Sequence, residues 1–182
     1  MFDLKSISFS SFDEENHKDC SSENTDIEYT VSGAISGAIT DVNSKRAKEQ
    51  AVLAYETIRN SKTDVKNISQ NTGYSEEDIR RVKNYLFVDE HEIYEDGEFI
   101  VNRFYPDFCI AQSWLRLAFH PDKIVDHDYT LLKHEIKEME LIKQGYSQNE
   151  AHIITEKRYF NYASECKKYY GELKRNEVEK QW

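Results

Sequence analysis

The chain contains few residues of the kinds that end or bend helices. Only two prolines and six glycines occur among its 182 residues. Proline and glycine are the residues least compatible with a helix interior, so long stretches of this chain can stay helical. Apolar residues recur at helical spacing through most of the chain beyond residue 41. We therefore expect an all-α protein of about six helices in a compact orthogonal bundle.

Capping residues indicate where these helices begin. Asn43 or Ser44 precedes a helix that is expected to reach Asn60. Ser147 and Glu150 form a capping box before a last long helix, which we expect to continue without a break through residue 169. The dipeptide Asp96-Gly97 lies between alternating residues and predicts one short β-hairpin near 93–104. The other expected helix starts are Asp64, Ser75, Pro106, and Asp126 or Asp128.

Charge divides the chain into regions. Residues 1–31 hold eight acids against two bases and are rich in serine and asparagine. Such a segment buries too little apolar surface to offset the entropy lost on ordering. We expect an acidic mobile tail or linker over 1–40, an all-α domain over 41–172 and a charged extension over 173–182.

Composition also excludes several classes of protein. No 18 apolar residues run together, so no transmembrane helix is expected. The first 20 residues lack the basic start and apolar run of a secretion signal. A net charge of −10 argues against a nucleic-acid coat or an anionic membrane as partner. Three widely spaced cysteines form no disulfide framework, which indicates reduced thiols in a cytosol-like compartment.

The segment 128–144 contains the main candidate for chemistry, in the order His134-Glu135-Ile-Lys-Glu138. His134 and Glu138 are one helical turn apart and could hold one cation together. Glu135 falls within the apolar arc of the helix, where a carboxylate needs a partner or a raised pKa. It is the candidate general base. The motif differs from the zincin HExxH, because Glu138 replaces the second histidine.

His152 is the candidate third ligand. A turn near Gly145 would make the two helices antiparallel and bring His152 close to Glu138. His152 also falls on a side of its helix that we expect to be buried. The sequence leaves three interpretations open: a divalent metal site, with zinc as the expected ion, a catalytic site without metal, and a core in which Glu135 pairs with a buried Arg116.

Other polar residues are weaker candidates. His91 lies in an acidic run and could be a general acid or base for phosphodiester cleavage, or an ordinary surface histidine. Arg116 and His91 are possible outer members of the catalytic site. His120 and His127 flank the loop 121–126 and could add to a metal site or be loop residues.

Residues 64–86 have the spacing of a helix-turn-helix, with Gly73 in the turn. Arg80, Arg81 and Lys83 could face phosphates. Three acids, residues 76–78, begin the would-be recognition helix and would repel them. A structural role in the bundle and a role in DNA binding are both open.

Four segments together form one overall pattern, which extends over about residues 33–170. They read SGAISGAITDVNSKRAKEQAVLAYETIRN, DVKNISQNTGYSEEDIRRVKNYLFVDEHEI, FYPDFCIAQSWLRL and HDYTLLKHEIKEMELIKQGYSQNEAHIITEKRYFNY. This pattern resembles a C-terminal module of bacterial polymorphic toxins, of the YD-repeat and LXG types, and of some prophage head-morphogenesis proteins. The polar signature of that module falls here on His91, Trp114, Arg116, His134, Glu135, Glu138, Glu150 and His152.

The resemblance implies a toxin-type effector but no particular reaction. It implies action in the cytoplasm, delivery from a secreted carrier or encoding on a prophage, and a cognate immunity protein as partner. Combined with the candidate site, it favours a hydrolase that acts on a peptide or phosphodiester bond of a macromolecule. A non-catalytic protein-interaction module and a DNA-binding protein are the alternatives.

Overall fold

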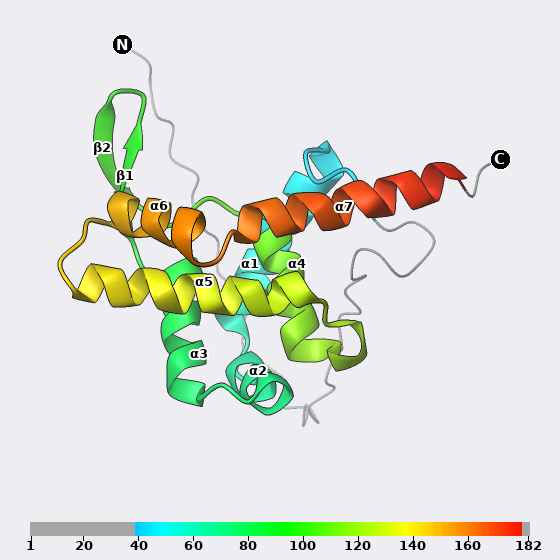
Figure 1. Cartoon of the computed structure of the whole chain (residues 1–182), viewed down its shortest axis with the longest axis horizontal. Helices are drawn as coiled ribbons and strands as arrows, with labels where there is room; N and C mark the ends of the chain where they lie inside the picture. Colours follow the sequence, from blue (N-terminus) through cyan, green and yellow to red (C-terminus); the bar gives the residue numbers. More distant parts are fainter. Residues whose placement is uncertain (1–38, 180–182) are drawn as a thin grey trace, which may run out of the picture.

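The computed structural model describes residues 39–179, and these residues are mostly helical, with one short hairpin (Figure 1). The α-helices are α1 (Lys45–Asn60), α2 (Asp64–Thr72), α3 (Glu76–Lys83), α4 (Phe108–Phe119), α5 (Asp126–Lys143), α6 (Gln148–Arg158) and α7 (Tyr162–Glu179). A π-helical turn, η1 (Asn84–Val88), continues α3, and a 3-10 turn, η2 (Pro121–Lys123), follows α4. Strands β1 (His91–Glu95) and β2 (Glu98–Asn102) form the hairpin. The expected all-α architecture with a hairpin is confirmed.

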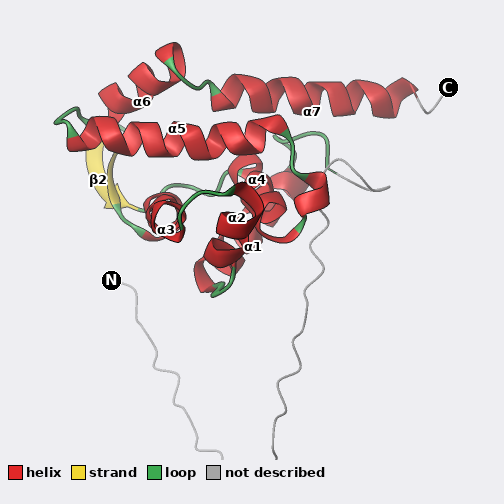
Figure 2. Ribbon diagram, turned by 60° about the horizontal axis from the view of Figure 1, so that its bottom comes forward, coloured by secondary structure: helices red, strands yellow, loops and turns green. Residues whose placement is uncertain are grey.

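Helix α5 lies in the middle of the molecule. Figure 2 shows α6 and α7 along one side of it and α1 to α4 on the other. Its apolar residues Leu131 and Leu132 are fully buried in the hydrophobic core. Because α5 borders both layers, its polar side chains can be enclosed by several elements at once.

Capping groups begin several helices as the sequence predicts. The Ser44 hydroxyl accepts a hydrogen bond from the Ala47 amide at the start of α1. Ser147 and Glu150 form the predicted capping box at the start of α6. The start of α5 differs from the prediction: its N-cap is Val125, and Asp128 accepts a hydrogen bond from the Val125 amide instead.

Helices α2 and α3 form the predicted helix-turn-helix-like unit. Gly73 ends α2 with a φ of 80°, a left-handed conformation that glycine adopts without steric cost. Ile68, Ile79 and Val82 are fully buried between this unit and the rest of the bundle. The unit therefore contributes to the core.

The hairpin projects from the bundle near the start of α6 (Figure 1). Asp96 and Gly97 form its turn with φ values of 51° and 92°. The strands are antiparallel, with Ile93 opposite Ile100. It covers residues 91–102, slightly earlier than the expected range.

The prediction of a single last helix is wrong, because the helix is interrupted between α6 and α7. The amides of Tyr159 and Phe160 both bond to the Thr155 carbonyl, and the next helix begins after Asn161. The Asn161 side chain accepts a hydrogen bond from the Ser164 amide, as a residue at a helix start does. The break leaves the Phe160 carbonyl outside the helical hydrogen-bond ladder.

The ends of the chain extend beyond the described part. Of the segment expected as an acidic mobile tail, 1–40, residues 1–38 lie outside the described residues. Part of the predicted charged extension, residues 173–179, continues α7. Among the described residues, no helix has the length and apolar character needed to cross a membrane.

Candidate metal centre

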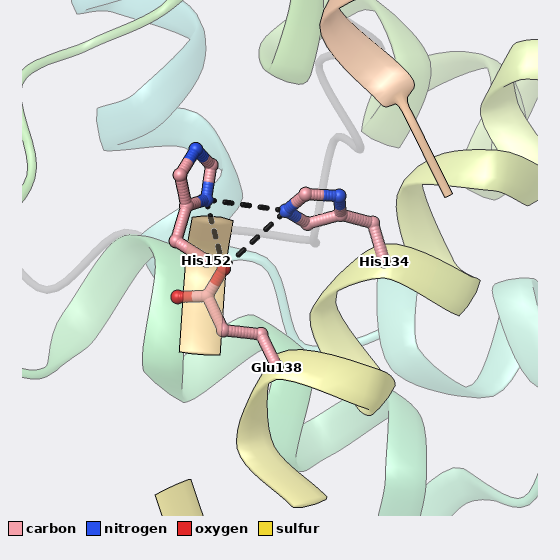
Figure 3. Close-up of side chains that lie close together, drawn as sticks. All are labelled: His134, Glu138 and His152. Atoms are coloured by element: carbon pink, nitrogen blue, oxygen red, sulfur yellow. Dashed lines mark hydrogen bonds and ion pairs between the residues drawn. The ribbon is translucent and has the colours of Figure 1, made fainter. Parts of the chain in front are cut away.

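Three of the predicted site residues come together at the contact of α5 with α6 (Figure 3). His134 and Glu138 lie one turn apart on α5 and are both buried. Gly145, with a φ of 101°, and the capping box after it reverse the chain so that α6 returns along α5. His152 on α6 thereby faces both of them.

The contacts between the three side chains are short. His134 Nε2 lies 3.3 Å from Glu138 Oε2 and 3.3 Å from His152 Nδ1. His152 Nδ1 lies 2.9 Å from Glu138 Oε2. Each residue thus directs one potential ligand atom to a common point. The expected burial of His152 is wrong, since 51% of its side chain is exposed.

These distances match the dimensions of a metal site. Nitrogen and oxygen ligands bind Zn²⁺ at about 2.0–2.1 Å in tetrahedral geometry, which separates the ligand atoms by roughly 3.3 Å. The three side chains could therefore hold one divalent ion with little rearrangement. Three protein ligands would leave the fourth tetrahedral position open, as in catalytic zinc sites.

The break between α6 and α7 orients His134. Its Nδ1 lies 2.7 Å from the Phe160 carbonyl, which can only accept a hydrogen bond. Nδ1 therefore carries the proton, and in the neutral ring Nε2 keeps a lone pair toward Glu138 and His152. Metal-binding histidines typically donate their other ring N–H to such a carbonyl, which fixes the tautomer and the orientation of the ring.

Tyr85 is a site residue that the sequence did not indicate. Its hydroxyl donates a 2.6 Å hydrogen bond to Glu138 Oε1, which leaves Oε2 to face the two histidines. Tyr85 lies in η1, where the wider π-helical turn shifts the side chains after Lys83 relative to α3. Such turns are frequent at functional sites, but the sequence NYLFV has no signature that distinguishes it from an α-helix.

His91 supports Tyr85 and does not contact the three-residue cluster. Its Nε2 lies 2.8 Å from the Tyr85 carbonyl, and its ring stacks on Phe104 at a centroid distance of 4.1 Å. The structure thus places His91 behind a residue that holds Glu138.

Glu135 lies beside the cluster without a partner of its own. Its side chain is 6% exposed, and no hydrogen bond or ion pair of its carboxyl group occurs among the described residues. Burial raises the pKa of Glu135 to about 8, and repulsion by Glu138 adds to this, while His134 and His152 oppose it.

The pKa values within the cluster reflect its hydrogen bonds. Burial alone would raise the pKa of Glu138, but hydrogen bonds from His134, His152 and Tyr85 outweigh burial and lower it to about 2. Burial disfavours protonated His134, yet contacts with Glu138, Glu135 and the Phe160 carbonyl raise its pKa. The hydrogen bond to Glu138 raises the pKa of His152 despite partial burial. The cluster therefore attracts a positive charge.

Two cavities meet at Glu135 and His152. One, of about 530 Å³, lies along α7 and the segment before α1. The other, of about 950 Å³, extends from Glu135 and Glu138 to the hairpin and the start of α6. Aromatic side chains line much of this second cavity, which we call the hairpin cavity: Tyr55, Tyr85, Tyr94, Phe99, Phe104 and Tyr105.

Arg116 lies away from the cluster and is not the partner of Glu135. Its Nε and Nη2 donate to the two oxygens of Asp128 at 2.9 and 2.6 Å. His127 Nε2 lies 2.9 Å from Arg116 Nη2. His120 lies at the end of α4 and does not join either histidine group described here. The suggestion that Arg116 neutralises Glu135 is therefore wrong.

The candidate phosphate contacts of the helix-turn-helix-like unit are largely occupied. Lys83 is buried and donates to Asp64 at 2.9 Å. Arg80 and Arg81 pair with acids of the same helix, Glu76 and Asp78. The expectation that Lys83 faces a phosphate is wrong, because it neutralises a buried carboxylate.

Comparison of the chain with protein-family models, with curated proteins and with solved structures finds no match.

Proposed function

We propose that this chain is a metal-dependent hydrolase that acts on peptide bonds. The convergence of His134, Glu138 and His152 at distances close to a tetrahedral edge supports this proposal more than any other observation. The metal is a divalent ion, with zinc favoured because two imidazoles and one carboxylate suit it.

The residues around the ion have separate roles. When bound, the ion lowers the pKa of a water molecule and polarises the carbonyl that is attacked. A bound cation beside Glu135 would favour its ionised form and offset the effect of burial on its pKa. Ionised Glu135 takes a proton from the attacking water as the water oxygen bonds to the carbonyl carbon. As the C–N bond breaks, Glu135 gives this proton to the leaving amine. Tyr85 and the Phe160 carbonyl position Glu138 and His134.

The lining of the hairpin cavity favours a peptide over a phosphodiester. Among the described residues that line it, Glu92, Glu135 and Glu138 are acidic, and none is lysine or arginine. Nucleic-acid backbones are held chiefly by basic side chains, so this cavity would repel them. An uncharged peptide bond meets no such repulsion.

The resemblance to toxin modules adds a biological setting to this proposal. We extend it to a toxin-type effector that acts in the cytoplasm and has a cognate immunity protein. A non-catalytic interaction module is the second candidate, and it is favoured by the exposed aromatic residues of the hairpin, such as Tyr94 and Phe99.

The test combines metal analysis with a substitution that preserves shape. Purified protein is expected to contain about one zinc per chain and to cleave a casein substrate. Glu135→Gln should keep the metal and the fold but lose at least about 100-fold in activity, the usual range for a general base. Glu140→Gln is the matched control, because Glu140 lies on the same helix and is exposed.

Two results would contradict the proposal. One is wild-type protein that binds no divalent metal at micromolar concentration in equilibrium dialysis. The other is a Glu135→Gln protein with unchanged activity. Expression in a bacterial cytoplasm separates the toxin setting from the chemistry, because growth inhibition is expected from the wild type and not from Glu135→Gln.

A further inference from the structure

The hairpin has the features of a surface that binds another chain. Strands β1 and β2 pair only with each other within the described residues, so each has an outer edge of unpaired backbone groups. Tyr94 and Phe99, opposite each other in the ladder, are 66% and 72% exposed. Exposed strand edges can accept an added strand, and exposed aromatics provide apolar contact area.

This surface is continuous with the metal centre. The hairpin cavity is lined both by Tyr94 and Phe99 of the hairpin and by Glu135 and His152 of the candidate metal centre. Glu135 is buried, without a partner among the described residues, and borders this space. A chain lying along the hairpin would thus reach the unpaired carboxylate and the open side of the three-ligand cluster.

Charge indicates what kind of chain would bind. Acidic side chains dominate the hairpin and its flanks, with only Arg103 as a base between residues 89 and 105. They are Asp89, Glu90, Glu92, Glu95, Asp96 and Glu98. Acidic side chains attract a positively charged partner and repel an anionic one.

We infer that the hairpin and its cavity bind the substrate as an extended, positively charged polypeptide, with a large apolar side chain in the cavity. This inference rests on the proposed function, because it assigns the substrate of the same site. Backbone groups at a hairpin edge would align the peptide, and the aromatic walls would select its apolar side chain.

Binding can be measured separately from cleavage. The probe is a fluorescein-labelled peptide with a central Phe-Leu pair flanked by lysines, titrated with zinc-loaded Glu135→Gln protein and followed by anisotropy. Phe99→Ala and Glu92→Lys should each weaken binding about tenfold, as loss of an interface anchor typically does. Leu53→Ala and Glu77→Lys are the matched controls, because these residues are exposed on α1 and α3. A peptide with glutamates in place of the lysines should bind about tenfold more weakly than the lysine peptide.

The outcomes separate this inference from the proposed function. If the wild type cleaves the peptide and binding is unchanged by Phe99→Ala and Glu92→Lys, the substrate surface lies elsewhere and the inference is overturned. If both changes weaken binding but the wild type cleaves neither this peptide nor casein, the hairpin and its cavity bind a polypeptide as inferred, and the hydrolase proposal fails. Equal binding of the two peptides would overturn the assignment of a positively charged substrate.

Discussion

Helix α5 contains two clusters of histidine and carboxylate that differ in one respect. Near its start, His127 and Asp128 are buried together with Arg116. Two turns later, His134 and Glu138 meet His152 from α6. The first cluster contains its own permanent cation, whereas the second consists of groups that accept a proton or a metal.

This difference separates a structural cluster from a candidate ligand site. Arg116 binds both oxygens of Asp128, so that carboxylate has no oxygen left to offer a ligand. In the second cluster, three atoms with lone pairs face one point, and a proton or a metal ion must sit among them to offset their repulsion. Residue type alone therefore does not identify the site, since both clusters combine histidine with a carboxylate.

The largest predicted effect concerns the cluster of Arg116, His127 and Asp128, which we call the closed cluster. Asp128→Ala should lower the free energy of unfolding by about 3–5 kcal/mol, because it leaves the buried Arg116 without a counter-charge. Urea denaturation followed by circular dichroism measures this loss. In metal-free protein, Glu138→Gln should cost less than half as much. Equal losses for the two variants would contradict the distinction between the clusters.

Zinc should stabilise the protein only through the cluster of His134, Glu138 and His152, which we call the open cluster. At a free zinc concentration 100 times the Kd, the folded state gains about 2.7 kcal/mol, which raises Tm by roughly 5–10 °C. His134→Ala and His152→Ala should abolish this shift. His127→Gln should keep it, whatever its own Tm. An unchanged shift in His134→Ala would place the zinc elsewhere.

More of the fold than of the candidate site could be predicted from the sequence. Caps such as Ser44 and the box of Ser147 and Glu150 act locally, so their consequences can be seen in a few neighbouring residues. The break at Phe160 could not be predicted in this way, since neither proline nor glycine marks it. It depends instead on how α6 and α7 pack along α5.

The convergence of the three candidate ligands was predictable because helical spacing links His134 to Glu138 and a short turn brings His152 near them. Tyr85 was not, because its bond to Glu138 joins residues 53 apart in sequence. The possible pairing of Arg116 with Glu135 is wrong for a similar reason. Both Glu135 and Asp128 are buried on α5, and the sequence does not show which of them α4 reaches.

Tyr85 supplies a finer test of the open cluster. Tyr85→Phe removes only the hydroxyl that holds Glu138, so zinc affinity should fall 10- to 100-fold, about 1.4–2.7 kcal/mol. Competition with a chromogenic chelator measures the affinity. Tyr105→Phe is the matched control, because its hydroxyl donates to the exposed Glu95 at the same distance of 2.6 Å. Equal zinc affinities for Tyr85→Phe and the wild type would mean that the hydrogen bond from Tyr85 to Glu138 does not contribute to zinc binding.

The smallest predicted effect is the pH response of the closed cluster. Burial lowers the pKa of His127 below 6.5, and Arg116 adds to this, although the carboxylates of Asp128, Glu165 and Asp126 oppose it. The unfolded chain then binds the proton more readily than the folded chain. Stability due to this group is present above pH 6.5 and is lost as pH falls through the folded pKa, by at most about 1.4 kcal/mol per pH unit.

His127→Gln removes this titration, so its free energy of unfolding should fall less steeply than that of the wild type on acidification from pH 7. Urea unfolding of metal-free protein at several pH values gives both slopes. His134 and His152 have raised pKa values and respond with the opposite sign, but they are common to both proteins and cancel in the comparison. Identical slopes would mean that Asp128 offsets Arg116 at His127, and that the closed cluster tolerates a second positive charge.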